Sequence, residues 1–345
     1  MTWAAIVLFA ALGLSAAAAP LTLPIEPAER MRGICLEGPP RRPDADPMPE
    51  MASLGVNWVS LTPFAHMSSD SSPDLRTSFN AGWWGESDEG LIECARWANA
   101  AGMRVMLKPH IWIRSRGSDA WRGTISMASE EAWGSWFDRY EEWMNHYAEL
   151  AEREQIEALV VGTELIRASL DPRCEPHWRR VIASVRERYS GLVLWSAHWE
   201  REFEDLPFWD ALDAMGVGVY FPLSQSDVPT DEELRASWRR AVRRIAEVSE
   251  EHQLPVIFTE IGYRSVSDAA KAPWLWQSEA PVDNELQRRL YEVMFEECWD
   301  QPWFGGLFVW KWYARTDRRG RHETDFTPQG KPALEVIRRW FQREP

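Results

Sequence analysis

The chain has 345 residues, of which 45% are hydrophobic and 26% are charged, the balance of an ordinary soluble globular protein. Its formal net charge is −15, and no cluster of Lys and Arg interrupts the acidic character, which argues against nucleic acid as a partner. The 22 Trp residues are a surplus for this length, and Trp has a flat apolar face that suits stacking on sugar rings.

The N-terminal segment has the features of an export signal. Residues 1–25 carry no charged side chain, residues 4–14 are apolar, and residues 16–19 are the small residues that precede a cleavage site. We therefore predict a signal peptide over residues 1–19 and a secreted or periplasmic protein, with no stable membrane insertion after cleavage. An uncleaved anchor is the alternative, because the apolar stretch approaches the roughly 18 residues that a spanning helix needs.

The four cysteines are scattered, and none forms a CxxC pair, which excludes a zinc knuckle or a CxxC redox motif. An export pathway would permit two disulfides, and four cysteines allow three pairings. Buried free thiols are the favoured interpretation. The residues are Cys35, Cys94, Cys174 and Cys298.

A short apolar run recurs eight times after the leader, and helical stretches lie between most of the runs. Near-continuous apolar runs are typical of strands buried on both faces in a parallel sheet. The runs cover residues 32–37, 56–62, 104–109, 158–164, 192–197, 214–220, 255–260 and 306–311. The helices are expected at residues 88–101, 129–154, 175–189, 231–252, 283–299 and 332–343.

This alternation predicts an α/β fold, a (β/α)8 TIM barrel that forms a single domain over residues 20–345. A doubly wound open sheet is the alternative, but no Gly-rich nucleotide turn follows the first run. The helix that begins near Ser129 carries an aromatic stripe at helical spacing, which indicates a core face rather than a ligand surface. The stripe consists of Trp133, Trp136, Phe137 and Tyr140.

Two glutamates, Glu164 and Glu260, end apolar runs, at the edge of the barrel where its chemistry is expected. A carboxylate at such a place is costly to desolvate unless function offsets the cost. Two facing carboxylates are what glycoside hydrolysis requires, one as proton donor and one as nucleophile or base. A structural role for each Glu, as partner of an Arg or a backbone amide, is the alternative. Glu37 is a third strand-end carboxylate that spacing alone does not exclude.

Further polar and aromatic residues end the runs, follow them or lie in the loop after the second run, and we expect them to bind sugar. Tyr220 is also a candidate to hydrogen-bond the nucleophilic glutamate. The alternatives are an ion pair for Lys108, structural roles for the histidines, a core position for Tyr220 and a lid for the loop tryptophans. A metal site is not expected, because the first run lacks a His-x-His motif, and no cofactor is expected either. The candidates are Lys108, His110, Thr163, His198, Tyr220, Trp310, Trp312, Trp83 and Trp84.

The segments VVGTEL, around Glu164, and FTEIGY, around Glu260, resemble the catalytic strands of clan A glycoside hydrolases. More narrowly, the chain resembles glycoside hydrolase family 113, the endo-β-1,4-mannanase group. The likeness extends to residues 106–110, 121–123, 306–312 and 326–332, and so to nearly all of the mature chain. It implies that Glu164 is the general acid/base, that Glu260 is the nucleophile of a retaining double displacement, and that Trp310 forms the floor under the cleaved sugar.

The chain departs from the clan at two places. Most members have Asn before the acid/base, where it binds the sugar 2-hydroxyl, whereas this chain has Thr163. The Arg that holds the nucleophile in much of the clan is missing from the second run, VNWVSLT, and Lys108 or Arg264 are the candidates to replace it.

We therefore expect a monomeric, retaining hydrolase of β-1,4-mannan or manno-oligosaccharides. Its partner is a polysaccharide or oligosaccharide substrate. Two alternatives remain, a hydrolase of another β-glycan such as glucan or xylan, and a carbohydrate-binding barrel without turnover. Retention of both Glu164 and Glu260 favours an enzyme. Endo or exo action is open.

Overall fold

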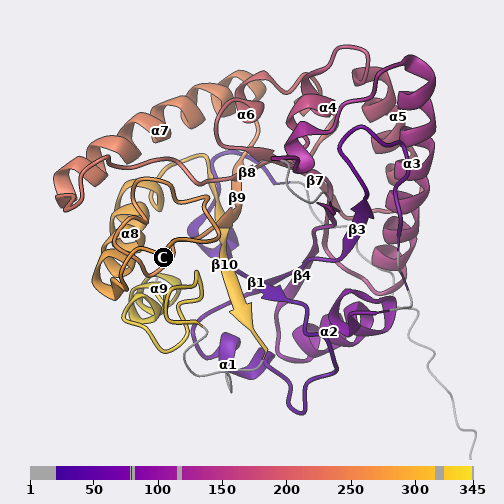
Figure 1. Ribbon diagram of the computed structural model, residues 1–345. Coiled ribbons are helices and arrows are strands. Elements are labelled where there is room, and N and C mark those ends of the chain that lie inside the picture. The colour runs from indigo at the N-terminus through magenta and orange to yellow at the C-terminus, as the bar shows by residue number, and fades with distance from the viewer. Residues whose placement is uncertain (1–20, 78, 80–81, 115–118, 315–321, 344–345) are drawn as a thin grey trace, which may run out of the picture.

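A closed barrel of eight parallel strands surrounds the centre of the molecule (Figure 1). The computed structural model describes residues 21–77, 79, 82–114, 119–314 and 322–343. Each strand overlaps one of the apolar runs, and pairing of the first strand with the last closes the sheet, so the (β/α)8 barrel is confirmed. The strands are β1 (Met31–Glu37), β2 (Trp58–Leu61), β4 (Arg104–Leu107), β6 (Ala158–Thr163), β7 (Leu192–His198), β8 (Ala214–Gly218), β9 (Val256–Ile261) and β10 (Phe304–Tyr313).

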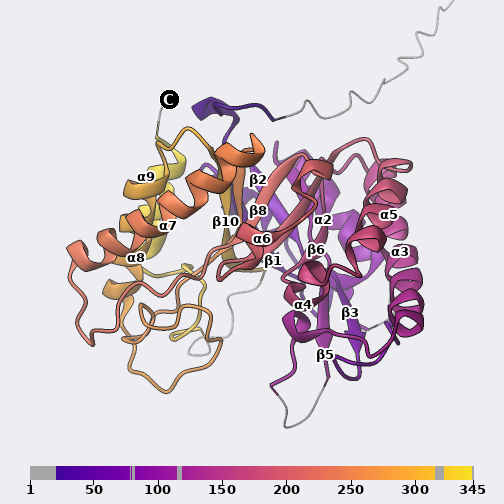
Figure 2. The same ribbon diagram turned by 90° about the horizontal axis from the view of Figure 1, so that it is seen from above.

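The helices form an outer ring around this barrel (Figures 1 and 2). Six match the expected stretches: α2 (Asp88–Ala100), α3 (Glu130–Arg153), α5 (Glu175–Arg186), α7 (Asp231–His252), α8 (Asn284–Cys298) and α9 (Ala333–Phe341). Side-chain N-caps begin several of them, as where the Ser129 hydroxyl accepts the Ala132 N–H. The short helices α1 (Met48–Ala52), α4 (Ile166–Leu170) and α6 (Glu202–Asp205) were not expected.

The aromatic stripe of α3 lies against the barrel wall, so its core position is confirmed. Trp133, Trp136 and Phe137 are fully buried, and the buried Tyr140 hydroxyl donates to the Val161 carbonyl at 2.9 Å. All four cysteines are buried free thiols, as favoured. Indole and phenol rings therefore account for much of the packing between α3 and the strands.

A small second sheet, which the sequence did not predict, extends one side of the barrel mouth (Figure 2). It pairs β3 (Phe64–Met67) with β5 (His110–Ile113) in parallel. These strands follow β2 and β4 after Pro63 and Pro109, which lack the N–H that a continuous ladder needs. The chain therefore leaves the barrel at the two prolines and pairs again beyond them, which places His110 above the strand ends.

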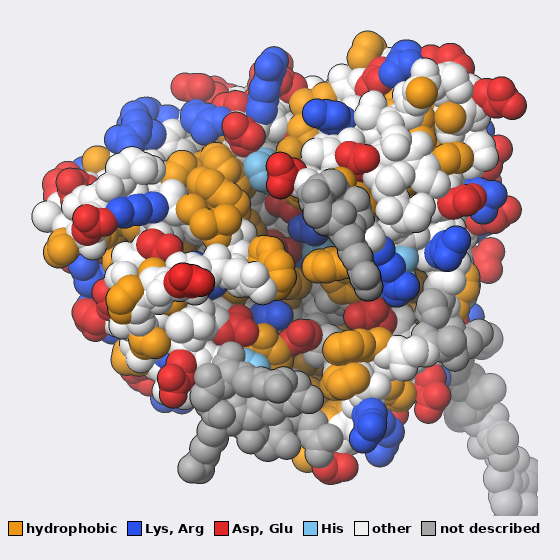
Figure 3. Space-filling view, in the orientation of Figure 1, with side chains coloured by type: hydrophobic (Ala, Val, Ile, Leu, Met, Phe, Trp, Pro, Cys, Tyr) orange, Lys and Arg blue, Asp and Glu red, His pale blue; other side chains and the backbone are white. Residues whose placement is uncertain are grey.

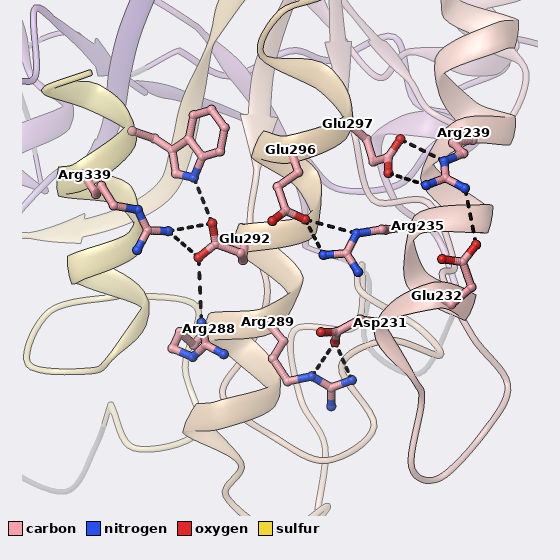
Figure 4. A network of polar contacts seen from close by, with 11 residues as sticks. Asp231, Glu232, Arg235, Arg239, Arg288, Arg289, Glu292, Glu296, Glu297 and Arg339 are labelled. Atoms are coloured by element: carbon pink, nitrogen blue, oxygen red, sulfur yellow. Dashed lines mark hydrogen bonds and ion pairs between the residues drawn. The ribbon is translucent and has the colours of Figure 1, made fainter. Parts of the chain in front are cut away.

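Ion pairs join the outer faces of α7, α8 and α9 (Figure 4). Arg235 reaches Glu296 at 2.5 Å, and Arg289 reaches Asp231 at 2.7 Å. Exposed pairs of this kind each contribute less than about 1 kcal/mol, so apolar packing holds these helices on the barrel. None of the helices in the described ranges is long and apolar enough to cross a membrane. The predicted signal peptide, residues 1–19, lies outside those ranges.

Candidate active site

The carboxylates of Glu164 and Glu260 stand at the carboxyl ends of the fourth and seventh barrel strands. Glu260 belongs to β9, and Glu164 directly follows β6, with its backbone at a φ of 50°. That left-handed conformation is uncommon for a residue other than glycine, and such outliers cluster at functional sites. The Glu164 N–H donates to the Ser196 carbonyl at 2.8 Å, which ties the residue to the neighbouring strand.

Two donors hold the Glu260 carboxylate in its ionised form. The Lys108 ammonium donates to Oε2 at 2.7 Å, and the Tyr220 hydroxyl donates to Oε1 at 2.6 Å. Burial opposes ionisation, but the positive charges of Lys108 and Arg122 and these two hydrogen bonds hold the pKa of Glu260 below its usual value. The expected contact between Tyr220 and this glutamate is confirmed, and the arrangement suits a nucleophile.

Lys108 takes the place of the missing strand-two arginine. Its ammonium also donates to the Thr259 carbonyl at 3.1 Å, and the side chain is 0% exposed. These contacts support the ion-pair alternative for Lys108, and its contact with a sugar hydroxyl stays a prediction. Arg264, the other candidate, instead lies 3.4 Å from Asp268.

Glu164 has a different environment, which the sequence did not indicate. Arg122, in the 3-10 turn η3 (Arg122–Thr124), donates from Nη2 to Glu164 Oε2 at 2.5 Å. Despite its burial, Arg122 has a raised pKa because both Glu164 and Glu260 lie close to it. One guanidinium therefore interacts electrostatically with both carboxylates, so the two lie in one site. The only sequence signal was the position of Arg122 in the resembling segment 121–123.

The residue before Glu164 is Thr163, where most clan members have Asn. The Thr163 hydroxyl is buried and donates to the Pro109 carbonyl at 3.3 Å. This contact ties β6 to the segment that leads into β5. The structure gives Thr163 a structural partner, and its contact with a sugar stays a prediction.

Trp310 and His110 line the mouth near Glu260. Their rings are almost parallel, with centroids 6.2 Å apart, and the Trp310 ring also lies 5.4 Å from the Lys108 ammonium. Burial and the positive charges of Lys108 and Arg122 hold the pKa of His110 well below its usual value, so this imidazole is neutral. Its buried Nε2 has no hydrogen-bond partner among the described residues, which leaves a polar group for a ligand.

A row of rings leads outward on the Glu164 side. Trp121 packs on His198, His198 on Trp199, and Trp199 on Trp274, with successive centroids 5.1 to 5.4 Å apart. His198 Nδ1 accepts the Glu200 N–H at 3.2 Å, and burial lowers the pKa of His198, so this ring is neutral as well. Figure 3 shows this face hollowed near its middle, with charged, His and hydrophobic side chains around the hollow.

The other predicted tryptophans occupy different places. Trp83 is 45% exposed and donates its indole N–H to the Gly38 carbonyl, just beyond β1. Trp84 is half-buried against the core and Trp97, so the lid alternative fits it better than a sugar contact. Trp312 is 1% exposed within the core, a position that favours packing over a sugar contact, and its contact with substrate stays a prediction.

The third carboxylate, Glu37, has a cationic partner of its own. The Lys311 ammonium is 3.4 Å from its Oε1. Burial, and then the charge of Glu37, raise the pKa of nearby Glu86 to about 7.

Within the described ranges, no three His, Cys, Asp or Glu residues are arranged to hold a metal ion.

The arrangement can perform acid/base and nucleophilic chemistry on one substrate. Glu260 is held ionised, and Glu164 stands at the same mouth with a single charged partner among the described residues. A (β/α)8 barrel with such carboxylates on its fourth and seventh strands defines a glycoside hydrolase.

The chain belongs to Glycoside Hydrolase Family 113, whose family model matches residues 41–331. It is similar to a solved GH113 β-1,4-mannanase, with 28% identity, a TM-score of 0.78, and coverage of 92% of this chain and 100% of that one. The GH113 β-mannanase AaManA from Alicyclobacillus acidocaldarius is 30% identical, with a TM-score of 0.76 and coverage of 90% and 97%.

A more distant likeness extends only to the fold. A β-glucuronidase from Ruminococcus gnavus is 13% identical, with a TM-score of 0.60, and the match covers 90% of this chain and 49% of that chain. No curated protein sequence matches the chain. Family membership makes the protein a glycoside hydrolase.

Proposed function

We propose that the enzyme hydrolyses β-1,4-mannan or manno-oligosaccharides with retention of anomeric configuration. The observation that carries the mechanism is the Glu260 carboxylate held ionised by Lys108 and Tyr220, with Glu164 in the same mouth. The substrate rests on the two similar structures, both of which are β-mannanases.

In the first step, Glu260 attacks the anomeric carbon while protonated Glu164 gives its proton to the glycosidic oxygen. The carbon–oxygen bond breaks, the shortened glycan leaves, and a glycosyl ester forms on Glu260. In the second step, the Glu164 carboxylate takes a proton from water, the water oxygen attacks the same carbon, and Glu260 is released. Trp310 supports the sugar ring between these two carboxylates.

A glycan panel tests the substrate. Mannan, β-glucan and xylan are digested with the wild-type protein, and binding of each is measured in parallel with Glu260→Ala. We expect manno-oligosaccharide products from mannan only. Turnover of glucan or xylan instead would favour the second substrate class. Binding without turnover on every glycan would favour the non-catalytic barrel, and product lengths would separate endo from exo action.

We also propose that the enzyme acts as an exported monomer. The uncharged residues 1–25 support export, and a site built from a single chain supports the monomer. The intact mass of the protein recovered outside the cytoplasm should correspond to cleavage near residue 19. The uncut mass in the membrane fraction would indicate an anchor, and size-exclusion chromatography with light scattering reports the oligomeric state.

A further inference from the structure

Arg122 is a half-buried cation in the mouth, and the double displacement assigns it no task. It contacts Glu164, the proton donor, whereas Lys108 and Tyr220 contact Glu260, the nucleophile. A guanidinium at 2.5 Å stabilises the ionised carboxylate. A general acid must be protonated before it acts, so this contact opposes the state that the first step requires.

The turn that carries Arg122 is anchored on both sides. The Trp121 N–H donates to Thr124 Oγ1 at 3.2 Å, and the Thr124 hydroxyl donates to Asp70 Oδ2 at 2.7 Å. A Cβ atom at Gly123 would lie 2.4 Å from the Trp121 ring, so glycine is needed for the indole to fold over the turn. The position of the guanidinium is therefore set by the turn as well as by its charge partner.

Arg122 is the direct cationic partner of the Glu164 carboxylate in the described part of the chain. Among the other groups that face Glu164, His198 is neutral, and Tyr220 remains a phenol because burial and both carboxylates raise its pKa. Burial raises the pKa of Glu202 to about 7, so this group does titrate near neutral pH, but it keeps its own donors and is the same in wild type and in the Arg122 variants. Across the mouth, Lys108 and Glu260 form their own pair. The charge next to Glu164 that a substitution can remove is therefore that of Arg122.

We propose that Arg122 is a positioning residue whose charge, in contact with the Glu164 carboxylate, sets the pH above which hydrolysis fails. This inference rests on the proposed function, with Glu164 as the acid. The same guanidinium stabilises the carboxylate that remains after the proton has moved to the leaving oxygen. Arg122 thus strengthens Glu164 as an acid and confines the active form of the enzyme to lower pH.

The first test is the pH profile of kcat/KM on a manno-oligosaccharide for wild type, Arg122→Gln and Arg122→Lys. In Arg122→Gln, the Glu164 carboxyl stays buried but loses its cationic partner. The alkaline limb of the kcat/KM profile should therefore move upward by about one pH unit or more. Arg122→Lys, which keeps the charge, should stay near the wild type. A limb that does not move, a limb that moves downward, or a uniform loss of rate without a shift would each overturn the proposal.

Arg235→Gln is the matched control. Arg235 makes the same kind of contact with Glu296, also at 2.5 Å, on the outer helices (Figure 4). Its removal should leave the alkaline limb in place. A shift as large as that of Arg122→Gln would overturn the inference, because it would show a general effect of charge.

The second test does not need activity, and so it separates failure of this inference from failure of the proposed function. Thermal unfolding is measured for wild type, Arg122→Gln, Glu164→Gln and the double variant. At pH 7 the two substitutions should be non-additive in Tm, and the coupling should vanish at a pH that protonates the carboxyl. Additive shifts at pH 7 would overturn the inference even in a protein that hydrolyses mannan, and coupling in a protein without turnover would leave only the proposed function in error.

Discussion

Gly218, the last residue of β8, leaves the space that the Glu164 carboxylate occupies. A Cβ atom at this position would lie 3.1 Å from Glu164 Oε1, so the carboxylate would have to shift by a few tenths of an ångström. We expect Gly218→Ala to fold normally and to lower kcat about tenfold, because small misplacements of a catalytic group are costly. Steady-state kinetics on a manno-oligosaccharide measures this loss.

Gly134→Ala on α3 is the control, because a Cβ atom there meets nothing within 4 Å. It should leave kcat unchanged. If Gly218→Ala also keeps its full kcat, the Glu164 carboxylate does not need the position that the structure gives it.

Trp310 and Trp133 show how position decides what one residue type does. Trp310 lines the mouth, whereas Trp133 is fully buried on α3. We expect Trp310→Ala to lose about tenfold or more in kcat/KM with little change in stability, because it removes a stacking surface. Trp133→Ala should lose about 3–5 kcal/mol of stability while the folded fraction stays active. Loss of activity in a folded Trp133→Ala protein, with Trp310→Ala unaffected, would contradict both placements.

At the scale of elements, the short helix α6 carries a buried carboxylate that supports the wall of the mouth. Glu202 is 0% exposed and accepts hydrogen bonds from the Ser169 hydroxyl at 2.7 Å and the Trp195 indole at 3.1 Å. It also accepts the His198 N–H at 2.7 Å, and this bond fixes the end of β7. Burial raises the pKa of Glu202 to about 7, although these hydrogen bonds oppose the rise.

This raised pKa makes stability depend on pH with a definite sign. Between about pH 4.5 and pH 7 the folded protein binds a proton at Glu202 that the unfolded chain has lost, so the free energy of unfolding falls as pH rises, by up to about 3 kcal/mol. Glu202→Gln cannot titrate, so the stability gap between wild type and this variant should narrow over that range. Tm measured at each pH detects the change. A constant gap would contradict it, and the exposed Glu200→Gln should keep the wild-type slope.

The eight barrel strands could be predicted because each is buried on both faces and reads as an apolar run. The strand-end rule then found Glu164, Glu260 and Tyr220. The pair β3 and β5 was missed because each strand is short and is separated from the preceding barrel strand by only two residues, the second of which is proline.

The differences between the expected and the observed site have physical causes of their own. Trp310 and Trp312 should share a face by strand alternation, but the register of β10 against β1 shifts between them, so Trp312 enters the outer core. Arg122 and Glu202 lie in a turn and a short helix, and only the folded chain brings them to Glu164 and His198. The local sequence pattern around Arg122 and Glu202 does not predict these long-range contacts.

At the scale of the whole molecule, ion pairs lie both on the outer helices and in the barrel mouth. The net charge is −15, and arginine–carboxylate pairs such as Arg235 with Glu296 lie between the outer faces of the helices (Figure 4). In the described part of the barrel mouth, Lys108 and Arg122 each lie beside one of the two carboxylates of the pair. The fold thus encloses two ion pairs whose partners differ, and the proposal gives the two glutamates different roles.

The products formed with azide by Glu164→Ala and Glu260→Ala test this division most directly. The substrate is an aryl β-mannoside whose leaving group needs no protonation. Glu164→Ala should still form the glycosyl ester, show a burst, and yield the β-mannosyl azide with retained configuration. Glu260→Ala should form no ester, and azide in the vacated space should yield the inverted α-mannosyl azide. Exchanged products would exchange the two roles, and full activity in either variant would move the site elsewhere, with Glu37 the next residue to test.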